Sequence, residues 1–181
     1  LSVLFQAPFR PSFHDATKKV DKASIGQYGV YQVAAELCRR GYTAVTTSRN
    51  TKAVDVLAFN PKNGKMVGIQ VKTGRQNGLK EKKARITVLS NTARNEIKGL
   101  KLLTPFVLVY VPDDEKLHPR FFVVPADKVL QMLEDYLDWE INKKNPIKKP
   151  LAMEVKTRWS FSVEEVESYE NKWENLGLGP V

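Results

Sequence analysis

The sequence predicts an α/β fold of the α+β kind, in which a central mixed β-sheet is flanked by helices and a C-terminal helix docks onto it. Three segments repeat apolar residues at helical spacing, and six shorter segments are rich in β-branched and aromatic residues. Clusters of Gly, Pro and Asn separate them. The length of 181 residues is that of one domain.

The first half of the chain predicts one helix followed by three strands. Ser24 can cap a helix over residues 25–40, and Gly41 ends it. The sequence Asn-Pro-Lys-Asn-Gly then marks a turn between the second and third strands. The strands are predicted over residues 42–47, 53–60 and 66–73.

The second half predicts further strands, an amphipathic helix over residues 126–139 and a basic loop over residues 142–150. A last helix over residues 163–176 should dock onto the body through apolar side chains that bury together. These side chains are Val166, Tyr169, Trp173 and Leu176. The further strands are predicted over residues 85–89, 105–111 and 120–124.

The two ends of the chain are expected to differ from its centre. Residues 1–8 resemble, with two substitutions, the recognition linker of a viral protease used to remove tags, and we expect them to be vector-derived or disordered. Residues 9–181 should form a single domain. Its core is predicted at about residues 24–140 and a C-terminal extension at about residues 141–181.

Positive charge is concentrated in the middle of the chain. Residues 62–101 hold eleven Lys and Arg against two Glu, an excess equal to the formal net charge of +9 for the whole chain. A local field of one sign favours a polyanion such as nucleic acid, and a solvated basic surface is the alternative interpretation.

The composition also predicts where the protein works. No apolar run approaches the roughly 18 to 20 residues that a bilayer span needs, so we expect no membrane partner. The single cysteine, Cys38, cannot form an internal disulfide and reads as a buried helix residue. A cytoplasmic location fits both observations.

Two of the predicted strands each carry a polar side chain in an apolar frame. A hairpin that turns about residues 61–64 places Asp55 opposite Gln70, and the alternation of side chains puts Lys72 on the same side. A carboxylate, an amide oxygen and an ammonium then converge. Carboxylate and amide oxygens suit Mg²⁺, and a lysine beside them can orient water or offset phosphate charge. A structural salt bridge between Asp55 and Lys72 is the alternative.

Residues 29–42, 50–58 and 69–73 contain Val-Ala-Ala-Glu-Leu, Val-Asp-Val-Leu-Ala and Gln-Val-Lys in that order. Together they resemble the core of the PD-(D/E)XK nuclease superfamily, which includes restriction endonucleases and Holliday-junction resolvases. The third motif is similar to that of small prokaryotic members that read Gln-Val-Lys. The resemblance implies a restriction-endonuclease-like α-β-β-β-α-β core and phosphodiester hydrolysis that depends on Mg²⁺, for which Mn²⁺ can substitute.

The resemblance also implies roles for individual residues. Asp55 would be the metal-binding acid, Gln70 would hold the position usually taken by Asp or Glu, and Lys72 would be the catalytic lysine. The main-chain carbonyl of Val71 would complete the metal shell. The neutral amide of Gln70 should lower the affinity for a divalent ion.

The first helix departs from the family pattern. Many relatives carry a Glu at the position of Val30. Glu36 lies six residues later, roughly 120° round the helix from that face, and is the candidate to replace it. The alternative is that Glu36 is a solvated helix charge.

The sequence therefore predicts an enzyme, a Mg²⁺-dependent endonuclease that hydrolyses DNA phosphodiester bonds with a metal-activated water. The alternative is a degenerate nuclease fold that binds DNA without cutting it. Double-stranded or branched DNA is the expected partner, and a homodimer is compatible with either function. The cations expected to contact phosphates are Arg75, Lys80, Lys82, Lys83 and Arg85.

Overall fold

The computed structural model describes residues 21–48, 54–76, 78–97, 101–143 and 156–181. The segment at residues 1–8 and the greater part of the predicted basic loop lie outside these residues. None of the helices in the described part is long and apolar enough to cross a membrane.

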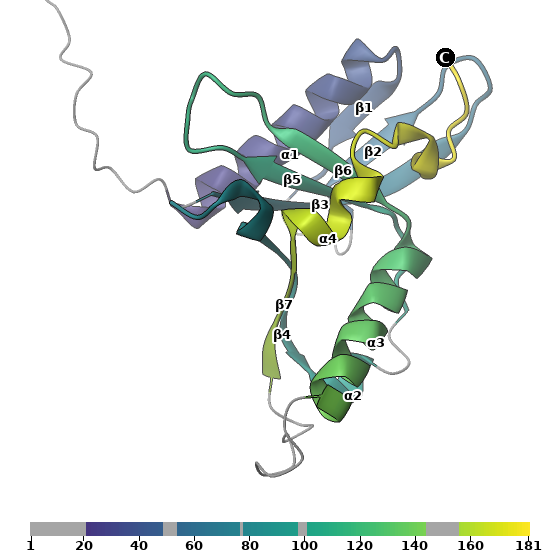
Figure 1. Cartoon of the computed structure of the whole chain (residues 1–181). Coiled ribbons are helices and arrows are strands. Elements are labelled where there is room, and N and C mark those ends of the chain that lie inside the picture. The colour runs from purple at the N-terminus through teal and green to yellow at the C-terminus, as the bar shows by residue number, and fades with distance from the viewer. Residues whose placement is uncertain (1–20, 49–53, 77, 98–100, 144–155) are drawn as a thin grey trace, which may run out of the picture.

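A five-stranded mixed sheet forms the centre of the fold, as predicted (Figure 1). The strands lie in the order β1-β2-β3-β5-β6, with β3 and β5 parallel and the other neighbours antiparallel. β5 is buried on both faces, which explains its unbroken apolar sequence. The strands are β1 (Thr43–Thr46), β2 (Val56–Phe59), β3 (Met66–Arg75), β5 (Phe106–Val111) and β6 (Arg120–Val124).

One face of the sheet is covered by helix α1 (Lys22–Arg39). Its N-cap is Asp21, whose carboxylate accepts the N–H groups of Ala23 and Ser24, so the prediction of Ser24 as the cap is wrong by three residues. Gly41 follows the helix with φ +90°, as its predicted role requires. Cys38 is exposed, contrary to the expectation of a buried thiol.

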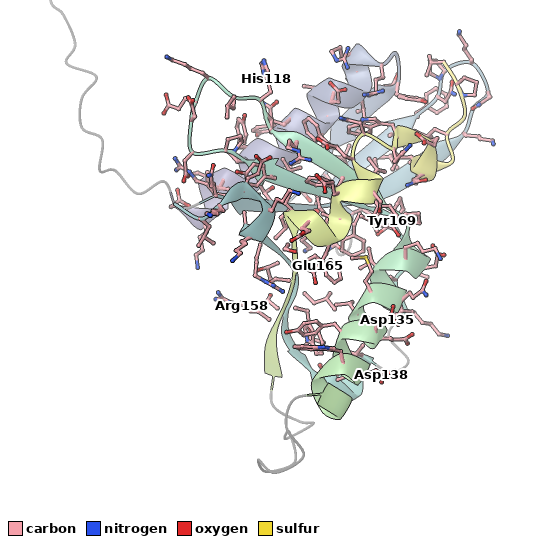
Figure 2. The ribbon with its side chains drawn as sticks, in the orientation of Figure 1. His118, Asp135, Asp138, Arg158, Glu165 and Tyr169 are labelled. Atoms are coloured by element: carbon pink, nitrogen blue, oxygen red, sulfur yellow. The ribbon has the colours of Figure 1, made fainter. Side chains whose placement is uncertain are left out.

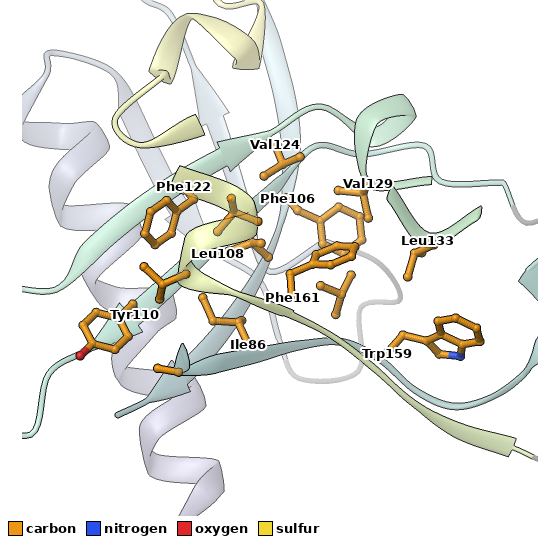
Figure 3. Close-up of a cluster of buried hydrophobic side chains, with 14 of the residues drawn as sticks. Ile86, Phe106, Leu108, Tyr110, Phe122, Val124, Val129, Leu133, Trp159 and Phe161 are labelled. Atoms are coloured by element: carbon orange, nitrogen blue, oxygen red, sulfur yellow. The ribbon is translucent and has the colours of Figure 1, made fainter. Parts of the chain in front are cut away.

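The opposite face carries a second apolar cluster (Figure 3). Helix α3 (Ala126–Lys143) contributes Val129 and Leu133 to it. A separate two-stranded antiparallel sheet, β4 (Arg85–Ala93) with β7 (Lys156–Ser162), contributes the side chains that alternate inward. Helix α2 (Arg94–Ile97) follows β4.

The predicted last helix over residues 163–176 is wrong. Helix α4 (Val163–Val166) ends after four residues, and 3₁₀ helices follow at Glu167–Tyr169 and Trp173–Leu176, separated by Asn171 with φ 53°. Strand β7, which precedes α4, is absent from the prediction. The apolar side chains of this region do not bury together. Val166 belongs to the cluster at α3, whereas Trp173 and Leu176 belong to the cluster under α1.

Candidate active site

The register of the β2–β3 hairpin is the predicted one. Val56 is paired with Ile69 and Phe59 with Met66, so the ladder runs toward Asp55 and Gln70 at its open end. Asp55 lies one residue before β2, where its N–H donates to the carbonyl oxygen of Ile69 at 2.8 Å. The carbonyl oxygen of Asp55 accepts the N–H of Thr47 at 3.0 Å, so its backbone is fixed from both sides.

The Asp55 carboxylate bonds to the edge of β3 just beyond the last residue of β3 that pairs with β2. Its Oδ2 atom accepts a hydrogen bond from the main-chain N–H of Val71 at 2.8 Å. In the part of the chain that the structure describes, β2 pairs with β3 as far as Ile69, and β3 continues beyond it to Arg75. The N–H and C=O of a strand residue point to the same edge, so the carbonyl of Val71 faces the side where Asp55 lies.

Gln70 and Lys72 lie on the face of the sheet opposite α1. Ile69 and Val71, which alternate with them, belong to the cluster under α1. Gln70 and Lys72 are both partly exposed, so the site is open to solvent. Asp55 directly precedes the β2 residue that pairs with Ile69, and its negative charge favours the ammonium form of Lys72, opposing the lowering of the Lys72 pKa by burial.

The environment of Lys72 disfavours its charged form. Burial lowers the pKa of the Lys72 ammonium, and the negative charge of Asp55 opposes part of this lowering. In the parallel ladder Lys72 is paired with Leu108, a fully buried core residue, so the base of the lysine lies beside apolar surface.

Asp55 and Lys72 do not form a close ion pair. Among the described residues, the ion pairs within 4.0 Å do not include these two. The structure therefore does not support a structural salt bridge as the reason for an acid and an amine at these positions.

The candidate metal ligands of this site are hard oxygen atoms, and together they carry a single negative charge. They are the Asp55 carboxylate, the Gln70 amide and the carbonyl of Val71. No group of three His, Cys, Asp or Glu that could hold a metal occurs among the described residues. This set does not fit a metal site built from protein ligands alone. It fits Mg²⁺, which keeps several waters and binds through one or two carboxylates together with substrate phosphates.

The structure places Glu36 away from these donors. Its carboxylate is held by Arg39 at 2.7 Å and Arg40 at 2.9 Å, and the hydrogen bond from Arg39 is the main cause of its lowered pKa. Glu36 lines an open pocket of about 480 Å³ with His118 and Phe121. His118 lies in the loop before β6 (Figure 2). The described contacts of Glu36 are thus with its own helix and with the region of β6, and contacts with Asp55 or Gln70 are not among them.

Val30 also contributes no charge to the site. It is partly buried and packs against the cluster under α1. The described part of α1 therefore supplies apolar contacts near the sheet at the position where the resemblance would place a carboxylate.

The predicted phosphate-binding cations differ in their exposure and in their contacts within the protein. Arg75 is paired with Asp113 at 3.1 Å. Lys80, Lys82 and Lys83 are exposed, the last two on the 3₁₀ helix Glu81–Lys83. The guanidinium of Arg85 donates to the main-chain oxygen of Ser160 and is exposed.

The sequence did not predict the ion pairs of Arg120, which tie the 3₁₀ helix Glu81–Lys83 to β6. Arg120 at the start of β6 binds Glu81 at 2.5 Å and also binds Glu170 at 2.5 Å. Glu81 is thereby turned to the body of the protein, while its lysine neighbours remain in solvent. The sequence offers no periodic signal for these contacts, since Glu81 is 39 residues and Glu170 is 50 residues from Arg120 along the chain.

Comparison with known proteins gives a similarity to solved structures at low sequence identity. No family model and no curated protein matches the chain. Among solved structures, the chain is similar to a bacterial homing endonuclease, I-Ssp6803I, with 12% sequence identity and a TM-score of 0.48. The similarity covers 87% of this chain and 91% of that chain. The function proposed below rests on the residues of the site and not on this likeness.

Proposed function

We propose that the protein is a metal-dependent endonuclease that hydrolyses DNA phosphodiester bonds at the Asp55, Gln70 and Lys72 group. The observation that carries the proposal is the position of the Asp55 carboxylate. It lies at the edge of β3 beyond the end of β2, close to a half-buried lysine without forming an ion pair with it. The resemblance of residues 29–42, 50–58 and 69–73 to the PD-(D/E)XK core supports the same activity.

Each residue would have a distinct task. Asp55, Gln70 and the carbonyl of Val71 would hold Mg²⁺ or Mn²⁺, which supplies Lewis-acid chemistry and an activated water when bound. Lys72 lies on the same face and would stabilise the charge that develops on the phosphate. The lowered pKa of Lys72 also brings its neutral form nearer to working pH, where it can orient or deprotonate a water.

The basic segment would hold the DNA backbone. Lys80, Lys82 and Lys83 follow β3 in the chain and project into solvent. Exposed lysines of this kind bind phosphates without regard to sequence, and the binding falls as salt rises. Nucleases that cut both strands often dimerise to bring two sites to one duplex, so a homodimer on DNA is compatible with the proposal.

Binding of DNA without cleavage is the second candidate function. It is favoured by the charge of the donor set, because Asp55 is its one carboxylate, Gln70 is neutral and Val30 is apolar. In that case DNA binding should need no divalent ion and should survive the loss of Asp55.

Incubation with DNA separates the two candidates. Supercoiled plasmid and branched DNA are treated in Mg²⁺ and in Mn²⁺ with wild type, Asp55→Asn, Lys72→Ala and Asp135→Asn. Asp135 is exposed on α3 and serves as the matched control. We expect wild type and Asp135→Asn to cut, and the other two to be slower by about 100-fold or more.

Two other results would change the conclusion. Equal cutting by all four proteins would assign the activity to a contaminant. Binding without cutting by wild type, undiminished in Asp55→Asn, would establish the non-catalytic function instead.

A further inference from the structure

The sheet formed by β4 and β7 is a two-stranded ribbon with two unlike faces. Its inward face carries Ile86, Val88, Trp159 and Phe161, all buried in the apolar cluster that includes the α3 side chains. A β-bulge between Thr87 and Leu89 adjusts the alternation in β4. The inward side chains hold the ribbon to the body. Among the described residues, the outward face makes contacts within the ribbon, such as the one from the Arg85 guanidinium to the main-chain oxygen of Ser160.

The outward face is polar and basic. The hydroxyls of Thr87 and Ser160 lie 3.1 Å apart across the ribbon, and Arg85, Ser90 and Arg158 are exposed. Neither arginine forms an ion pair within the described residues. The outward cross-strand pairs are Arg85 with Ser162, Thr87 with Ser160, and Ser90 with Arg158.

Helix α3, on the other side of the ribbon, carries the opposite charge. Its exposed side chains include three acids, Asp127, Asp135 and Asp138. Among the described residues of the helix, Lys128 is the exposed cation. Figure 2 shows Arg158 on the side of the ribbon away from Asp135 and Asp138. A solvated surface usually mixes both signs, whereas here the cations and the acids are segregated to two sides. A polyanion is therefore attracted to the ribbon and repelled by α3.

The base of the ribbon lies on the sheet face that bears the candidate active site. Gly74 is two residues after Lys72 on the same side of β3, about 7 Å further along the strand. A Cβ atom on Gly74 would meet the carbonyl oxygen of Arg85 at 2.7 Å and the Cγ1 atom of Ile86 at 2.9 Å. Only glycine permits this approach, so the ribbon starts directly on the strand of Lys72.

We propose that the outward face of the β4–β7 ribbon enters the major groove of duplex DNA and contacts base edges there. The inference rests on the proposed function, since it makes this ribbon the element that positions a duplex over Asp55 and Lys72. Arg85 and Arg158 are the groups suited to guanine, and the hydroxyls of Thr87, Ser90 and Ser160 suit several bases.

The dimensions and chemistry of the ribbon match that role. The major groove is about 12 Å wide and admits a two-stranded ribbon. Outward residues repeat about every 7 Å along a strand, near twice the 3.4 Å rise of one base pair. Arginine binds guanine O6 and N7 in two hydrogen bonds, and Ser and Thr hydroxyls bond to several base edges. The outward face alternates arginines with hydroxyls, so it offers hydrogen-bonding groups that suit base edges in addition to positive charge.

Selection from a DNA pool tests the proposal. A duplex pool with a randomised centre is bound to the full chain in EDTA, and the retained DNA is sequenced. The selected duplex is then compared with the same duplex containing 7-deazaguanine, which lacks the N7 acceptor in the major groove. Affinities are measured by fluorescence anisotropy for wild type, Arg85→Ala, Arg158→Ala, Arg158→Lys and Lys128→Ala. Lys128 on α3 is the matched loss of one charge.

We expect a guanine-containing preference for wild type and Lys128→Ala, and a loss of about tenfold in affinity when 7-deazaguanine is substituted. In Arg158→Ala and Arg85→Ala the difference between the two duplexes should shrink. Arg158→Lys should keep its affinity for unselected DNA but lose the preference, because lysine keeps the charge without the paired hydrogen bonds.

The proposal is overturned if selection yields no preference, or if both arginine variants discriminate as Lys128→Ala does. In those cases cutting by wild type would leave the nuclease function intact and remove the ribbon from it. If wild type neither binds nor cuts DNA, the proposed function fails and the ribbon proposal fails with it.

Discussion

The carboxylate of Asp55 accepts a hydrogen bond from the main-chain N–H of Val71 at 2.8 Å, across the point where β2 ends and β3 continues. This contact joins the two motif strands and directs the acid to the edge of β3. It also means that Asp55 has two separable properties, an oxygen that accepts this bond and a negative charge near Lys72.

Two substitutions of Asp55 should separate these properties. Asp55→Asn keeps an oxygen acceptor for Val71, so its free energy of unfolding should stay within about 0.5 kcal/mol of wild type, while DNA cleavage is lost. Asp55→Ala leaves the Val71 N–H without its partner and should cost about 1–2 kcal/mol. Urea denaturation measures the stability, and plasmid nicking measures the activity. A cleavage rate in Asp55→Asn equal to that of wild type would remove the charge from the mechanism.

Gly29 should resist substitution because α1 lies close to β3. A Cβ atom there would be 1.9 Å from the Oγ1 atom of Thr73. We expect Gly29→Ala to lower the free energy of unfolding by about 2 kcal/mol through overpacking. Gly26→Ala is the control on the same helix, because nothing lies within 4 Å of its Cβ position. This control should gain up to about 1 kcal/mol from helix propensity. Equal effects in urea denaturation would contradict the close packing.

Glu170 should make stability depend on pH in the acid range. Arg120 donates two hydrogen bonds to its carboxylate, at 2.8 Å and 2.5 Å, and these lower the pKa of Glu170 below its ordinary value of about 4.5. A lowered pKa contributes stability above about 4.5, and that contribution is lost as pH falls through the lowered value. Glu170→Gln should therefore cost about 1–2 kcal/mol at neutral pH and progressively less in acid.

The difference in unfolding free energy between wild type and Glu170→Gln isolates this effect, since the other carboxylates are common to both proteins. Denaturation midpoints in urea at a series of pH values from neutral downward measure it. A difference that is constant with pH would show that the Arg120 contact does not favour the charged carboxylate.

Lys82 and Lys83 should contribute to DNA affinity through phosphates. Each alanine substitution should weaken binding by a similar factor on all sequences and reduce the slope of log affinity against log salt by about 1. Lys128→Ala on α3 should leave the slope unchanged. Anisotropy titrations at several salt concentrations provide the slopes. Variants with the wild-type slope would place the DNA elsewhere on the protein.

The central sheet was predictable because its signals are local. The Asn-Pro-Lys-Asn-Gly turn and the alternation of side chains determine the register of Asp55 and Gln70 before any tertiary contact is known. The strand at residues 120–124 is found at those residues, Arg120–Val124. Its neighbour β5 was predictable from its unbroken apolar sequence, which is typical of a strand buried on both faces.

The C-terminal region was not predictable from periodicity alone. Val166 and Trp173 fit one helix by spacing, yet they bury on opposite faces of the sheet, so tertiary packing overrides the local pattern. A signal for β7 was present in the alternation of Arg158, Trp159 and Ser160, but the residues ahead of it are rich in lysine and proline and suggest a loop. The place of Glu36 depends on how α1 is set against the sheet, which helical spacing does not specify.

Anomalous scattering from Mn²⁺ in crystals grown with a DNA duplex tests the central claim most directly. The account predicts a peak at roughly 2.0–2.2 Å from an Asp55 carboxylate oxygen, beside the Gln70 amide oxygen and a DNA phosphate. A peak bound by other residues, or DNA seated on the protein with its phosphates remote from Asp55 and Lys72, would contradict it.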